Sequence, residues 1–230
     1  MTQVLRGNIV HAPAMGRLDI LEHGCLVLED GVIAGLYPDL PAHLEGAEVR
    51  DFGDRIIMQS FADMHLHAPQ YPMLGMGMDL PLLDWLNTYT FPTEARFADL
   101  DYARRVYRRL ATDLITNGTT RVCMFSSLHT DATLVLMDEL ERAGVTGYVG
   151  KVNMDRNGLP GKLQETTEES VAETLRWLDA CHFEHVKPIL TPRFTPSCTD
   201  GLMTQLGKLA NERGLYVPVS YTHLRAHETV

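Results

Sequence analysis

From Ile56 onward, short apolar segments with the spacing of strands alternate with longer segments that have the spacing of helices. Strands are predicted at residues 119–125, 145–149 and 186–190, and helices at about 99–117, 130–143 and 198–213. Another helix begins at a capping box between Thr166 and Glu169 and runs to about His182. Such alternation predicts an α/β fold with parallel strands and crossover helices, either a doubly wound sheet or a (β/α)8 barrel.

The first 55 residues follow a different pattern, in which short strands are separated by turns. The predicted strands are residues 4–10, 25–28, 32–37 and 48–52. Asp30-Gly31 lies between two apolar segments and is typical of a hairpin turn. A strand-rich segment of this size is too small to hold a large core, so we expect it to need a partner segment.

Two histidines, His65 and His67, follow the apolar residues 56–58. Side chains two residues apart in a strand point to the same face, so both imidazoles, and Asp63 before them, would face one point. Neutral imidazole suits zinc, and a catalytic zinc usually has three protein ligands and a water. With ten histidines in the chain, roughly 0.4 such pairs arise by chance. The residue types alone therefore leave both a metal site and two structural histidines open.

The residues around this pair resemble the amidohydrolase superfamily. Phe61-Ala-Asp-Met-His-Leu-His67 is similar to the signature of its first barrel strand. The segments Ala68-Pro-Gln-Tyr71, Asp79-Leu-Pro-Leu-Leu-Asp-Trp-Leu86 and Tyr89-Thr-Phe-Pro92 resemble the guanine-deaminating family within it. That family usually has Pro-Gly where this chain has Gln59-Ser60, residues that shape the start of the strand and not the metal site.

The resemblance implies a TIM-like (β/α)8 barrel, in which functional residues lie at the C-terminal ends of strands. We accordingly expect residues 1–55 to be the N-terminal part of a small β-sandwich and residues 56–217 to be the first half of the barrel. In the superfamily the other half of the sandwich comes from the C-terminus, and a whole barrel takes roughly 250 residues. The chain has 230 residues, so the expected fold is a partial barrel.

The resemblance also implies the site residues. His65 and His67 would ligate Zn²⁺, and His67, Gln70, Arg193 and Phe194 would contact a guanine substrate. Gln70 offers both a donor and an acceptor, Arg193 offers only donors and suits the guanine carbonyl, and Phe194 can stack on the ring. Without the resemblance, an arginine at a strand end is more often structural.

The implied reaction is hydrolytic deamination of guanine to xanthine and ammonia. A bound zinc lowers the pKa of its water toward about 7 and so supplies hydroxide. The family's acid/base glutamate and metal-bound aspartate are expected beyond this part of the sequence, so no catalytic residue is assigned within the chain. The alternative substrate is another cyclic amidine, such as a pyrimidine, a pterin or a triazine.

The end of the chain does not continue the pattern. A fifth strand begins at about Leu215, but polar and charged residues follow, and Ser220 stands where the family has its third histidine ligand. The segment from Val219 to Val230 resembles a translated sequencing adaptor. Our hypothesis is that residues 218–230 are a non-native tail and that the 230-residue chain is an inactive fragment of a deaminase.

Composition narrows the remaining possibilities. The net charge is −10, and the basic residues are scattered or confined to one helix, which argues against nucleic acid as a partner. The sequence has no apolar run of about 18 residues and no leader, so we expect a cytoplasmic protein without a membrane span. Four cysteines lie far apart without a C-x-x-C motif, which favours reduced thiols. A homodimer is expected from the resemblance alone.

Overall fold

The computed structural model describes residues 1–218, which divide into two compact units. The first unit is Met1–Ser60, and the second begins at Phe61. Apart from Pro218, the predicted tail lies outside the described residues, as does Ser220. Each unit is considered below by itself.

The N-terminal unit is a four-stranded sheet in the order β3-β2-β1-β4. Its strands are β1 (Thr2–Ala14), β2 (Arg17–Glu29), β3 (Val32–Tyr37) and β4 (Glu48–Met58). β2 pairs with β1 and β3 in antiparallel register, whereas β4 runs parallel to β1. The predicted hairpin is confirmed: Asp30 and Gly31 have φ angles of 48° and 81°, which suit the two central positions of a type I′ turn.

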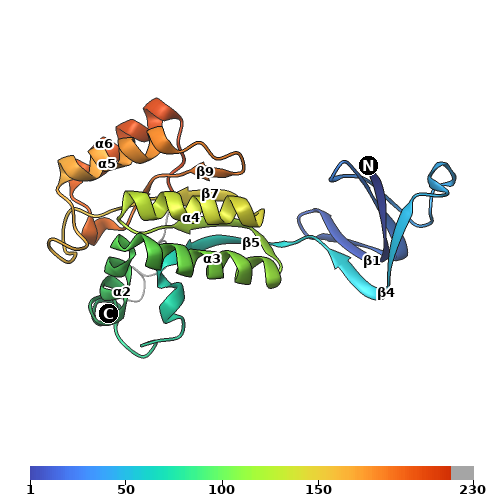
Figure 1. Cartoon of the computed structure of the whole chain (residues 1–230), viewed down its shortest axis with the longest axis horizontal. Coiled ribbons are helices and arrows are strands. Elements are labelled where there is room, and N and C mark those ends of the chain that lie inside the picture. The colour runs from blue at the N-terminus through green and yellow to red at the C-terminus, as the bar shows by residue number, and fades with distance from the viewer. Residues whose placement is uncertain (219–230) are drawn as a thin grey trace. The chain divides into compact units, whose positions relative to one another are not determined.

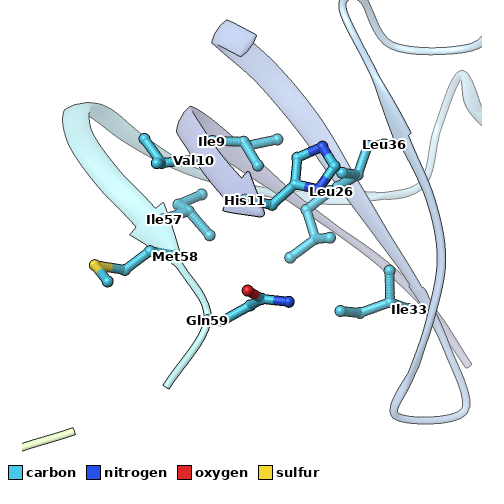
Figure 2. Close-up of a pocket in the computed structure, with 9 residues that line it drawn as sticks. All are labelled: Ile9, Val10, His11, Leu26, Ile33, Leu36, Ile57, Met58 and Gln59. Atoms are coloured by element: carbon cyan, nitrogen blue, oxygen red, sulfur yellow. The ribbon is translucent and has the colours of Figure 1, made fainter. Parts of the chain in front are cut away.

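The two faces of this sheet are covered to different degrees. One face carries a small buried cluster of Val4, Cys25 and Val27. The other face holds an open apolar pocket of about 230 Å³ (Figure 2). Its lining includes Ile9, Leu26, Ile33, Leu36, Ile57 and Met58.

The boundary between the units differs from the predicted one. We predicted that the second unit begins at Ile56, but Ile56, Ile57 and Met58 pair with Asn8, Ile9 and Val10 of β1. They are the last residues of β4 and belong to the N-terminal sheet. An apolar triplet suits a strand in either sheet, so its composition does not show which partner it takes.

The second unit is built on a parallel sheet in the order β5-β6-β7-β9 (Figure 1). Its strands are β5 (Phe61–His67), β6 (Thr119–Phe125), β7 (Thr146–Gly150) and β9 (Val186–Pro188). Helices α3 (Leu100–Thr116), α4 (Thr130–Ala143), α5 (Thr167–Ala180) and α6 (Asp200–Arg213) alternate with the strands. The strands follow one another in chain order, whereas a doubly wound sheet reverses its order at a switch point. The predicted α/β fold with barrel-like succession is confirmed.

Local sequence signals explain where these helices begin and end. The Asp99 carboxylate accepts hydrogen bonds from the first backbone N–H groups of α3, and the predicted capping box of Thr166 and Glu169 opens α5. Gly144 and Gly214 end α4 and α6 in the left-handed conformation. The helices pack their apolar faces on the sheet and form the main core around Trp177.

A helical segment between β5 and α3 was not predicted from the sequence patterns. It comprises α1 (Leu82–Trp85), a π-helical turn (Leu86–Thr90), α2 (Phe91–Ala95) and a 3-10 turn (Arg96–Ala98). Another 3-10 turn, Ala68–Met73, follows β5 directly. These segments place additional side chains at the C-terminal ends of the strands.

Beyond the ends of β7 and β9, the short strands β8 (Val152–Asn153) and β10 (Thr191–Pro192) pair in parallel. β9 ends at Pro188, two residues before the predicted end. The predicted fifth strand at about Leu215 has no regular pairing within residues 1–218, although Leu190 N–H donates to the carbonyl of Tyr216 (3.0 Å).

Two expectations from composition can be compared with the structure. All four cysteines are free thiols, and burial raises the pKa of Cys181 to about 11, as expected for reduced thiols. In the part of the chain that the structure describes, no helix is long and apolar enough to cross a membrane.

Candidate functional site

His65 and His67 lie side by side at the C-terminal end of β5. Their ring centroids are 5.1 Å apart and their planes are nearly perpendicular, at 80°. Phe125, the last residue of β6, contacts both imidazoles: its centroid is 5.2 Å from that of His65 and 4.7 Å from that of His67. The structure therefore brings together the two histidines that strand alternation predicted to face one point.

His67 is held as a neutral imidazole. Burial, followed by the positive charge of Arg193 and by His65, lowers its pKa well below the ordinary value. Its Nδ1 atom is buried, and no hydrogen-bond partner for it is found within residues 1–218. A neutral imidazole with an unpartnered ring nitrogen is the form of histidine that binds a metal ion.

The spacing of the pair also fits a shared ion. Two imidazoles on one tetrahedral zinc, each at about 2.0–2.1 Å through nitrogen, have ring centres roughly 5 Å apart. Asp63 does not join them, because its Oδ1 accepts a hydrogen bond from the backbone N–H of His65 (3.1 Å). The described residues contain no group of three or more histidine, cysteine or carboxylate side chains placed to hold a metal. They therefore supply two ligands.

Arg193 follows β10 and lies at the same edge of the fold. Its backbone N–H donates to the carbonyl of Asn153 (3.1 Å), which ties it to the segment after β7. Its guanidinium donates from Nη1 to Oε2 of Glu94 and from Nη2 to Oε1 of the same carboxylate (3.0 Å). Arg193 is 4% exposed and Glu94 is 1% exposed, so both members of the ion pair are buried.

Gln70 joins this ion pair from the 3-10 turn after β5. Its Nε2 donates to Oε1 of Glu94 at 3.1 Å. One carboxylate therefore links the two residues that were predicted to contact the substrate.

Aromatic side chains surround the polar groups. The guanidinium of Arg193 lies 4.9 Å from the centroid of the Phe91 ring. Phe194 is half-buried and packs on the apolar cluster that includes Phe91 and Phe125. The four predicted ligand contacts, His67, Gln70, Arg193 and Phe194, thus lie in one neighbourhood.

Sequence analysis missed Glu94 and Phe125. A signal for Glu94 was present, because it lies three residues after Phe91 and three residues before Phe97, on the apolar side of a helical segment. A carboxylate at such a position indicates a buried partner. Phe125 ends a predicted strand and carried no separate signal.

The chain is similar to proteins of known activity. The family model described as the amidohydrolase family matches residues 56–229. The guanine deaminase of Rattus norvegicus is 40% identical over 226 residues, which are 93% of this chain and 50% of the rat protein. The Escherichia coli enzyme of the same name is 32% identical over 199 residues, with coverage of 85% and 45%.

Solved structures extend the comparison. The crystal structure of guanine deaminase from C. acetobutylicum with bound guanine in the active site is 43% identical, with a TM-score of 0.89 and coverage of 94% of this chain and 52% of that one. A triazine hydrolase variant at 15% identity and a TM-score of 0.76 shares the fold. The chain spans about half the length of these relatives. By its sequence match and its fold, the chain belongs to the amidohydrolase family.

Proposed function

We propose that the whole protein containing this chain is a zinc-dependent deaminase that hydrolyses guanine to xanthine and ammonia. The observation that carries the proposal is the placement of His65 and His67 beside Arg193, at the C-terminal edge of the parallel sheet, with Gln70 joined to Arg193 through Glu94. The similarity to guanine deaminases, one of them with guanine bound, supports this choice within the family.

The polar groups suit a purine that carries a carbonyl. A guanidinium has five N–H donors, and Arg193 uses two of them on Glu94. The remaining donors are free for the carbonyl oxygen of guanine, an acceptor that adenine lacks. Phe194 offers an aromatic face for stacking on the purine. The triazine hydrolases share the fold alone, and no contact of the described residues favours a triazine, a pterin or a pyrimidine.

His65 and His67 would hold the zinc ion. When bound, zinc supplies a water whose pKa is lowered toward about 7. Phe125 packs against both imidazoles and keeps them in place, and burial keeps His67 neutral, so no proton has to leave it before it can bind the ion. A catalytic zinc needs about three protein ligands, and residues 1–218 supply two, so we expect the 230-residue chain alone to be inactive.

The proposal includes two expectations about the state of the protein. A homodimer and a cytoplasmic location both stay predictions that rest on the family resemblance. Light scattering after size-exclusion chromatography of the whole protein would test the first, and fractionation of the source cells would test the second.

The test is ammonia release by the whole protein from guanine, adenine, cytosine and melamine, together with metal analysis. Guanine is the expected substrate. In His65→Ala, metal and activity should be lost together, because the second histidine alone holds the ion poorly. In Arg193→Ala, guanine turnover should fall while zinc stays bound. Full activity in His65→Ala, or preferred turnover of melamine, would contradict the proposal.

A further inference from the structure

We propose that Glu94 is a positioning residue that orients both Gln70 and Arg193 and so determines which purine edge the site accepts. The inference rests on the proposed function, since it concerns how guanine is selected. It assigns a role to a buried carboxylate that contacts neither the metal ligands nor the expected position of the reacting carbon.

Glu94 is saturated by the two side chains that it contacts. It accepts hydrogen bonds from both terminal nitrogens of Arg193 and from Nε2 of Gln70, and it is 1% exposed. A buried ion pair of this kind is weak evidence of stabilisation, because apolar side chains of the same volume often stabilise a core equally well. The pair therefore invites a functional explanation.

The carboxylate determines which way the Gln70 amide faces. An ionised carboxylate can only accept hydrogen bonds, so the amide must turn its NH₂ group toward Glu94. Its Oε1 then points away from Glu94, and this oxygen is an acceptor. The site consequently offers donors from Arg193 and an acceptor from Gln70.

This arrangement matches one purine edge and mismatches another. Guanine carries a carbonyl acceptor beside a ring N–H donor, which complements Arg193 and Gln70 respectively. Adenine carries an amino donor beside an unprotonated ring nitrogen, which is the reverse order. A site with this polarity rejects the wrong edge because its buried polar groups would be left unpaired.

Helix α2 fixes the guanidinium from two directions. It contributes Glu94, which receives the hydrogen bonds of Arg193, and Phe91, whose ring centroid lies 4.9 Å from the guanidinium carbon. Charge pairing and cation–π contact together leave Arg193 little freedom to turn. A short helix between β5 and α3 therefore orients a residue that follows β10.

The experiment compares guanine with 2-aminopurine, which has the same amino group at C2 but no carbonyl at C6, in the whole protein and in Glu94→Gln. For guanine, kcat/KM should fall roughly 10- to 100-fold, mainly through KM, because hydrogen bonds to a charged partner are lost. For 2-aminopurine the fall should be much smaller. Zinc content should not change.

Glu139→Gln is the matched control. Glu139 is also buried, at 4% exposed, and pairs with Arg104 and Arg108, but it lies on α4 between helices. This variant should lower the melting temperature and leave the preference for guanine over 2-aminopurine unchanged. If Glu94→Gln does not fold, Glu94→Asp, which keeps the charge one methylene further away, should fold and show a reduced preference.

The outcomes separate the two proposals. If the unmodified whole protein releases no ammonia from guanine, the proposed function fails. If it deaminates guanine and a folded Glu94→Gln or Glu94→Asp variant keeps the original preference, the role of Glu94 is wrong and Arg193 and Gln70 are oriented by other contacts.

Discussion

The two units of the chain differ in how their sheets are covered. In the second unit, helices pack on the parallel sheet, and Tyr107, Leu136 and Trp177 are fully buried. In the N-terminal unit, Ile33 and Met58 on the pocket face are 60% and 55% exposed. A sheet is stabilised when a second layer buries its apolar face. The second unit has such a layer within the described residues, whereas the pocket face of the N-terminal sheet has none there.

Substitution of Trp177 should have the largest effect on this contrast. Trp177→Ala removes a fully buried indole from α5 and should cost the second unit about 3–5 kcal/mol. Hydrogen exchange would show lost protection in β6 and β7 but not in β1. Trp177→Phe is the control: it keeps most of the volume and removes an indole N–H without a partner among residues 1–218, so its loss should be much smaller. Equal losses in both units would mean that they unfold together.

Substitution of Val27 probes the small core of the other unit. Val27→Ala, at a position 2% exposed, should destabilise the N-terminal sheet by about 2 kcal/mol. Val32→Ala, at 69% exposed, should change stability by less than about 0.5 kcal/mol. Exchange of the β1 and β2 amides measures both. Similar effects of the two substitutions would show that the cluster of Val4, Cys25 and Val27 contributes little.

Acid should affect the second unit more than the first. Hydrogen bonds from Arg108 and Arg176 hold the pKa values of Glu139 and Glu173 below the ordinary 4.5. Because these values are lower in the folded state, the carboxylates stabilise it above pH 4.5 and lose this effect as the pH falls through the folded values.

In the N-terminal unit, the lowered pKa of Asp19 beside Arg17 is an exposed interaction and should matter little. Both tryptophans, Trp85 and Trp177, belong to the second unit, so urea unfolding followed by fluorescence at pH 6 and below pH 4.5 measures its share. A midpoint that does not move across this range would exclude these carboxylates as a source of stability.

The smallest expected effect on stability comes from the open pocket. Ile33→Lys places a charge on an exposed position of the N-terminal sheet and should change its stability by less than about 0.5 kcal/mol. Binding of a hydrophobic dye should nevertheless fall, because the pocket is lined by apolar side chains. Unchanged dye binding would place the exposed apolar surface elsewhere.

Local signals explain what could be predicted from the sequence. The Asp30-Gly31 hairpin, the capping box at Thr166 and the glycine after α4 each depend on residues within one turn of one another. The same is true of His65 and His67, because strand alternation alone makes them neighbours.

The rest depends on contacts between distant segments. Glu94 and Arg193 are 99 residues apart, and nothing near Glu94 in the sequence specifies which cation it meets. The triplet from Ile56 to Met58 has the composition of a barrel strand but pairs with β1. Such pairings are decided by the packing of the whole unit, which periodicity does not describe.

The order of the parallel strands has a consequence for synthesis on the ribosome. Each of β6, β7 and β9 pairs with the strand made before it, so a newly emerged segment finds its partner already available. Loop closure between consecutive strands involves one helix at a time, which keeps its entropic penalty small. The growing sheet can therefore add one strand and one helix per step, with β5 as its first template, before the remainder of the protein has been translated.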